Sequence, residues 1–339
     1  MTKPEKRSAL FLPHQIVGQM LNTRFDQAVR RNYFKGMEFA APVGDPGWFG
    51  PGSAVWHVHS HTYALIFGLQ CAAYMERLDP SIYWMGMHHS RLVKRDPETG
   101  IAVPQIDPKG ALVRLGHSVA FFIGTAYGST DTAERLAQTV RAMHHTIKGT
   151  RPDGAPYDAD DPDWLRWNYA TVVWGLATAH ELYHPNPLRG KRLDQYYGEF
   201  VRVGHALGGT DLPSTKAETA ECLESYLPKL AVTHGTAMST GANLPMPQAA
   251  VDWAIRDTMP KWAKQMIHHQ DPNIIERTVR RATVWSIING LQTAAGTPPE
   301  FRQAQERVKA GTTVPHTLPT YQLGDDPVRT REEIEHSFA

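Results

Sequence analysis

The chain is poor in cysteine and has no excess of charge of either sign. Cys71 and Cys222 are the 2 cysteines among 339 residues, and no CxxC spacing occurs. This excludes a disulfide framework and a cysteine-based zinc site, and it fits a reducing compartment. Lys and Arg number 35 against 34 Asp and Glu, and no basic run exceeds two residues. Because nucleic-acid binding needs a concentrated basic face, we expect no nucleic-acid partner.

Long apolar runs are also missing. The most apolar windows, YALIFGLQCAAYM and SVAFFIGTAYG, are too short to span a bilayer and fit buried helices better. The charged start MTKPEKRSAL is not typical of a secretory signal. We therefore expect a cytoplasmic protein without stable membrane insertion. The GxGxxG, P-loop and GxSxG motifs are absent, which argues against a nucleotide cofactor and a serine hydrolase.

Helical patterns dominate the chain. Apolar residues recur at helical spacing in 131–148, where Gly149 is the expected C-cap, and along one face of a helix that begins at Asp161–Pro162 and ends at Pro185. Thr215 and Glu218 fit a capping box, and a long helix is predicted from Pro272 to about Ala295. Segments 40–54 and 96–110 are predicted loops, and the best strand candidate is AVWHVHSH at 54–61.

These patterns predict an all-α protein with one large helical domain and a pocket between its helices. We place this domain at 31–310, after an N-terminal extension over 1–30 and before a polar C-terminal tail over 311–339.

Seventeen histidines are the strongest compositional signal, and imidazole enrichment suggests metal or haem chemistry. Two of them, His144 and His145, are adjacent in a predicted helix. His144 follows Val140 by four residues and precedes Ile147 by three, so it joins the apolar stripe, whereas His145 is rotated by about 100°. The buried His144 has two interpretations: a hydrogen-bonded core histidine, or an axial haem ligand enclosed by apolar neighbours. Periodicity alone does not choose between them.

Other histidines offer rival sites. The HVHSH stretch places His57, His59 and His61 on one face if extended, and His57 with His61 on one face if helical, where they could bind zinc or non-haem iron. No Asp or Glu lies at a convincing partner spacing. The pairs His88–His89 and His268–His269 are expected on the surface. Cys71, inside an apolar run, is expected to be an inert thiol rather than a haem ligand.

Several segments, in order, resemble the MpaB-type and rubber-oxygenase catalytic domain family. They are GDPGWFGPGSAVWHVH at 44–59, MHHSRLVKRDP at 87–97, RLGHS at 114–118, YGSTDTAERLAQTVRAMHHTIKG at 127–149, YDADDPDWLRW at 157–167, and the stretch around Glu199. The resemblance covers roughly 30–290. It implies an all-α fold, haem b and dioxygen as co-substrate, with oxidative cleavage of a double bond as the family precedent.

The resemblance also implies roles for individual residues. The histidine of VRAMH matches the family's proximal haem ligand, which makes His144 the expected iron ligand and His145 the fallback. Latex-clearing proteins carry Arg-x-x-Lys-Thr on the distal side, where this chain has Arg114, His117 and Ser118. His117 could ligate the iron or donate a hydrogen bond to bound dioxygen. Arg114 could stabilise negative charge on reduced oxygen or pair with a haem propionate.

The chain departs from the family pattern at two positions. Tyr169 and Asp79 stand where many relatives have histidine, and a phenol at Tyr169 could have taken over that place in the cofactor pocket. The acidic base proposed for latex-clearing proteins has no secure counterpart in this chain; Glu98 lies at about the right distance along the sequence, in a predicted loop.

The expected function is therefore a haem-dependent oxygenase acting on a small apolar or aromatic molecule. Alternatives are another haem enzyme, such as a peroxygenase or a dehydrogenase-like tailoring enzyme, or a haem- or ligand-binding protein without turnover.

Overall fold

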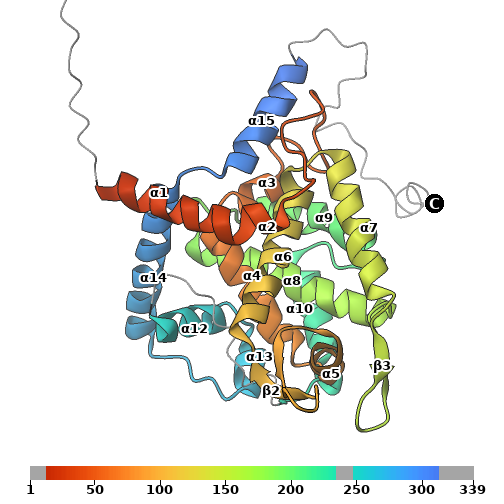
Figure 1. Ribbon diagram of the computed structural model, residues 1–339. Coiled ribbons are helices and arrows are strands. Elements are labelled where there is room, and N and C mark those ends of the chain that lie inside the picture. Colours follow the sequence, from red (N-terminus) through yellow and green to blue (C-terminus); the bar gives the residue numbers. More distant parts are fainter. Residues whose placement is uncertain (1–12, 234–246, 313–339) are drawn as a thin grey trace, which may run out of the picture.

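A computed structural model describes residues 13–233 and 247–312. Helices make up 66% of the described residues, and the strands there form two small antiparallel hairpins, so the predicted all-α class is confirmed. Figure 1 shows α6 (Pro108–Tyr127) and α8 (Pro162–Tyr183) in the middle of the helical body. There, α7 (Thr130–His144) runs along one side and α14 (Ile274–Ala295) along the other.

The core is built around the crossing of α4 (Thr62–Glu76) and α8. Two glycines permit this close approach: a Cβ at Gly68 would lie 2.7 Å from the Cα of Leu176, and one at Gly175 would lie 2.4 Å from the carbonyl oxygen of Gly68. The helix α8 begins as predicted, because the Asp161 carboxylate accepts a hydrogen bond from the Asp163 N–H and Pro162 occupies the first turn. The predicted apolar stripe of α8 is buried along its whole length: Leu165, Tyr169, Val172, Val173, Leu176, His180 and Tyr183.

The segment between α6 and α8 differs from prediction at one end. Ser129 caps α7 as its hydroxyl accepts from the Thr132 N–H, but the helix ends at His144 and not near Gly149. The reason is a hairpin: β3 (Lys148–Thr150) pairs with β4 (Pro156–Asp158), and Gly149 lies within it opposite Tyr157. The chain therefore leaves the helix earlier to reach the extended conformation that strand pairing requires.

Two further predictions need correction. The stretch AVWHVHSH is not a strand: α3 (Ala54–His59) is a helix capped by the Ser53 hydroxyl, which accepts from the Trp56 N–H. The loop predicted at 96–110 is shorter, because β2 (Ala102–Ile106) pairs with β1 (Val93–Arg95), and α6 already begins at Pro108. The loop over 40–54 is confirmed apart from its last residue, which begins α3.

The capping box is confirmed at Thr215, whose hydroxyl accepts from the Glu218 N–H, and the predicted C-terminal helix is α14, capped by Asn273. Other helices complete the body: α1 (Pro13–Phe25), α2 (Arg31–Tyr33), α5 (Pro80–His89), α9 (Lys191–Ala206), α10 (Lys216–Ser225), α12 (Gln248–Asp257), α13 (Lys261–Met266) and α15 (Pro299–Thr312).

Both ends of the described chain are tied to this body. The Asn22 side chain donates to the Ala295 carbonyl, and Arg30 forms an ion pair with Glu300. Arg307 of α15 is only 1% exposed and donates to carbonyl groups of Asp45, Phe39, Tyr127 and Gly128. The N-terminal 12 residues and the predicted tail from 313 onward lie outside the described residues.

Candidate functional site

His144 ends α7 and faces inward, as its place in the apolar stripe predicts. It is 9% exposed, whereas the neighbouring His145 is exposed and pairs with Asp160. The edge of the His144 ring packs against Trp164, with the ring centres 5.5 Å apart. This pair links the end of α7 to the first turn of α8 and fixes the plane of the imidazole.

The electrostatic surroundings keep the His144 imidazole neutral. Burial is the main cause that lowers its pKa to about 4, and the positive charge of Arg114 lowers it further. Its buried Nδ1 has no hydrogen-bond partner among the described residues. Such an atom is unusual in a folded core, where buried polar atoms are nearly always paired. A neutral imidazole with an unpartnered nitrogen suits the role of a metal or haem-iron ligand.

The RLGHS segment lies on α6, opposite α7. Arg114 is exposed and lies close enough to interact electrostatically with both His144 and the Glu76 carboxylate of α4. Ser118, four residues later, shares its helix face and is half-buried. His117 is exposed and its ring lies 4.6 Å from that of Tyr33, on α2. The structure therefore places Arg114 within electrostatic range of His144, and His117 against Tyr33 of the N-terminal segment.

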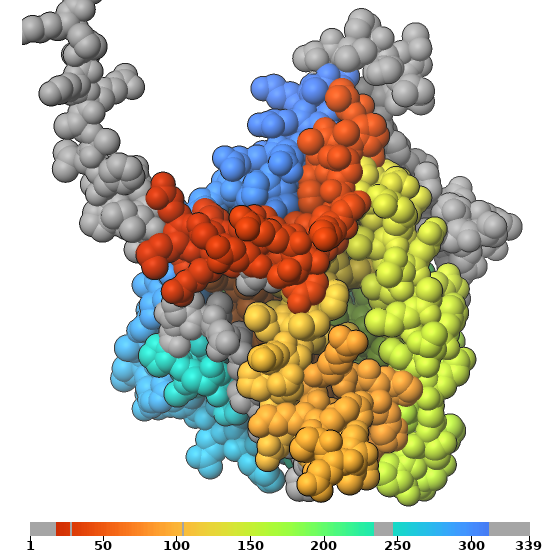
Figure 2. All heavy atoms as spheres, viewed as in Figure 1, coloured from red at the N-terminus to blue at the C-terminus, as the bar shows by residue number. Residues whose placement is uncertain are grey.

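Figure 2 shows a hollow in this face of the molecule, between α6 in yellow and α7 in yellow-green, with green atoms of a later segment deeper inside. Partly buried apolar side chains of both helices, Phe122, Leu136 and Val140, pack against the main core. The two helices approach closely at Gly124, because this glycine leaves room for the Leu136 side chain. A groove between helices with an inward histidine at one end is a common location for a planar cofactor.

The positions that depart from the family pattern have structural roles. Tyr169 is 5% exposed, its hydroxyl donates to the carbonyl of Pro213 at 3.1 Å, and its ring stacks on Phe200. Asp79 caps α5 by accepting from the Ser81 N–H. Glu98 is exposed in the loop between β1 and β2.

Asn168, next to Tyr169, donates to the half-buried carboxylate of Glu76 at 2.9 Å. Burial raises the pKa of Glu76, and the charges of Arg114 and Arg77 oppose that change. Glu76, and not Glu98, is therefore the carboxylate that lies near Arg114. Its sequence context, at the end of an apolar helix, gives no sign of this role.

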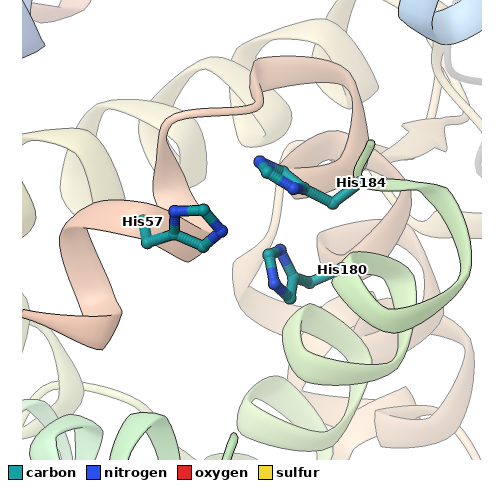
Figure 3. A group of neighbouring side chains, drawn as sticks. All are labelled: His57, His180 and His184. Atoms are coloured by element: carbon teal, nitrogen blue, oxygen red, sulfur yellow. The ribbon is translucent and has the colours of Figure 1, made fainter. Parts of the chain in front are cut away.

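A second group of histidines lies at the C-terminal end of α8. His57, His180 and His184 offer nitrogen atoms that all lie within 4.8 Å of one another, and Figure 3 shows their rings converging from α3 and from the end of α8. His180 and His184 are four residues apart, so they share one helix face. The HELYH stretch indicates that His180 and His184 lie side by side, but the sequence does not show that His57 lies next to them.

The rival site predicted at HVHSH is only partly assembled. Because the segment is helical through His59, His57 and His59 lie on opposite sides of α3. His59 is buried against Phe122 and Tyr196, whereas His57 and His61 both contact the ring of His184, at 4.6 and 5.5 Å between ring centres.

Of three smaller predictions, two are confirmed, and the surface position of the His268–His269 pair is confirmed only for His268. His88 and His89 are exposed, and both bind the Tyr157 hydroxyl. His268 is exposed, whereas His269 is half-buried. Burial raises the pKa of the Cys71 thiol to about 12, as expected of an inert cysteine.

Comparison with known proteins places this geometry in a family. No curated protein and no solved structure matches the chain. Within the described ranges, no helix has both the length and the apolar character needed to cross a membrane. A family model described as "ER-bound oxygenase mpaB/B'/Rubber oxygenase, catalytic domain" matches residues 56–288, which include α6, α7, α8 and both histidine sites. The chain therefore belongs to the mpaB/rubber oxygenase catalytic domain family, and its family is one of oxygenases.

Proposed function

We propose that the protein is a haem b-dependent oxygenase that uses dioxygen, with His144 as the protein ligand of the iron. The observation that carries this proposal is the state of His144: a buried, neutral imidazole with an unpartnered nitrogen, at the end of α7. The residues present fit the group, because haem iron in helical proteins is commonly held by a neutral histidine in an apolar groove. The family match supports the oxygenase activity.

A bound haem supplies an iron that binds and activates dioxygen. The protein supplies the environment of that iron. The Trp164 ring packs against the His144 ring, and the partly buried side chains Phe122, Leu136 and Val140 make the neighbouring faces of α6 and α7 apolar.

Arg114 is the fixed charge in this site. A guanidinium keeps its positive charge at any physiological pH and binds oxygen anions through several N–H groups. Beside His144 it can pair with a haem propionate or with negative charge that develops on oxygen. Ser118 lies on the same face and offers a hydroxyl to the same group. The His117 ring packs against Tyr33, so it must move away from Tyr33 before it can act on the distal side of a bound haem.

The substrate class that we propose is a small apolar or aromatic molecule, in line with the partly buried apolar and aromatic side chains of α6 and α7. The resemblance to the rubber-oxygenase family implies oxidative cleavage of a double bond as the precedent. Glu76 is a half-buried carboxylate on which the charge of Arg114 acts, and burial raises its pKa, which favours the protonated form. It is therefore our candidate for proton transfer during turnover.

Oxygen uptake tests this proposal. The reduced, haem-loaded protein is mixed with a panel of small isoprenoid and aromatic compounds, and dissolved dioxygen is recorded with an electrode. Substrate-dependent uptake with incorporation of ¹⁸O₂ into the product is expected, and Arg114→Gln should reduce the rate by about 10- to 100-fold. Turnover with peroxide only would instead identify a peroxygenase. A haem-loaded protein that turns over neither oxidant would be a haem-binding protein without oxygenase activity.

A further inference from the structure

We propose that His57, His180 and His184 form a second metal site, which binds one divalent first-row transition ion such as Zn²⁺ independently of the haem. Three imidazoles whose nitrogen atoms lie within 4.8 Å of one another match the donor set that such ions prefer. Three protein ligands also leave a coordination position for water, as in catalytic zinc sites. The proposal does not rest on the oxygenase function, because none of the three residues belongs to the groove at His144.

The fold builds this cluster from two distant segments. His180 and His184 lie one turn apart at the end of α8, and α3 delivers His57 from the opposite side (Figure 3). The ring centres are 5.3 Å apart for His57 and His180, 4.6 Å for His57 and His184, and 4.5 Å for His180 and His184. Such separations bring all three rings within reach of one ion after small side-chain rotations.

A buried atom without a partner points to a ligand in this cluster. His180 is 1% exposed, yet its Nδ1 has no hydrogen-bond partner among the described residues. Leaving a buried ring nitrogen unpaired costs about 1–3 kcal/mol. In Figure 3 the His180 ring faces the rings of His57 and His184. A metal ion bound at Nδ1 would give this atom a partner, with the ring hydrogen moved to Nε2.

The turn after α8 determines which nitrogen of each ring carries hydrogen. The Leu188 N–H donates to Nε2 of His180 at 2.8 Å, and the Asn186 N–H donates to Nδ1 of His184 at 3.0 Å. Nε2–H of His57 donates to the Asn186 carbonyl at 2.8 Å, which leaves its Nδ1 lone pair available. Metal binding must therefore release two backbone N–H groups from His180 and His184, while His57 already has the arrangement that metal ligands adopt.

A calorimetric titration tests the site. The full chain without a histidine tag, treated with a chelator and otherwise as purified, is titrated with ZnCl₂. One tight equivalent is expected, and His57→Ala and His184→Ala should each weaken it by more than about 100-fold, since losing a direct ligand exceeds the effect of losing an outer-shell partner. His268→Asn is the matched control, because this exposed histidine lies outside the cluster and Asn tolerates its positive φ of 53°. It should leave the affinity unchanged.

Amide hydrogen exchange separates this site from binding elsewhere. With Zn²⁺ bound, the amides of Asn186 and Leu188 should exchange faster, because they lose their acceptors. Absence of a tight equivalent, equal affinity in both cluster variants and the parent protein, or unchanged exchange at these two amides would overturn the proposal. The Soret absorbance is recorded in the same samples. If the chelator leaves the haem content unchanged, a failure of the zinc site can be distinguished from a failure of the oxygenase proposal.

Discussion

Replacing His59 by glutamine should weaken the dependence of stability on pH. The His59 ring is 1% exposed, donates from Nδ1 to the Phe122 carbonyl and accepts at Nε2 from the Tyr196 hydroxyl. Burial lowers its pKa to about 4 in the folded protein, against an ordinary value of 6.5 when unfolded. The unfolded chain therefore binds a proton more readily, and the stability that His59 contributes is complete above pH 6.5 and lost as the pH falls toward 4.

The size of this effect follows from the two pKa values. Between pH 6 and pH 4.5 the unfolded state holds nearly one more proton at this site, so the free energy of unfolding should fall by about 1.4 kcal/mol per pH unit. From pH 7 to pH 5 the loss amounts to about 2 kcal/mol for this ring alone. The whole stability of a domain is about 5–15 kcal/mol, so the effect is large enough to measure.

Urea denaturation at pH 7, 6 and 5 measures it. Glutamine carries no titrating group, so the difference between the parent protein and His59→Gln should shrink by about 2 kcal/mol between pH 7 and pH 5. Tyr196→Phe is the control, because it removes one hydrogen bond and keeps the imidazole; its difference from the parent should change much less. If the free energies of unfolding of the parent and of His59→Gln fall in parallel from pH 7 to pH 5, the lowered pKa of His59 is not a cause of the pH dependence.

Three substitutions test the packing of the fold by thermal or urea denaturation. Gly175→Ala should destabilise the protein by about 1–3 kcal/mol, because the new Cβ would lie 2.4 Å from the Gly68 carbonyl, and an unchanged midpoint would show that α4 and α8 separate easily. Gly290→Ala, inside α14 with nothing near its Cβ position, should stabilise by up to about 1 kcal/mol, and a loss would mean that this face is covered. Asp257→Asn should lower the free energy of unfolding by about 2 kcal/mol, because the carboxylate is buried and pairs with Arg281. An unchanged free energy of unfolding would show that this ion pair does not stabilise the fold.

The sequence predicted helices well where their ends are encoded locally. Asp161 with Pro162 marks the start of α8, and the Thr215 hydroxyl caps α10, because a side chain bonds to backbone groups within three residues. The orientation of His144 and His145 also followed from 3.6 residues per turn.

Predictions failed where distant residues decide the local structure. The end of α7 depends on strand pairing between 148–150 and 156–158, and α3 is helical although its pattern alternates. The cluster of His57, His180 and His184 depends on the packing of α3 against the end of α8, more than 120 residues along the chain. No local pattern encodes such a contact.

The absorption spectrum of the purified, haem-supplied protein shows whether His144 binds the haem iron, when His144→Ala and the matched control His145→Ala are measured beside it. We predict a Soret band in the parent and in the control, because the His145 side chain is exposed, and a lost or strongly shifted band in His144→Ala. A protein that stays colourless after haem is supplied, or a spectrum that is identical in His144→Ala, would contradict the assignment of His144 as the iron ligand.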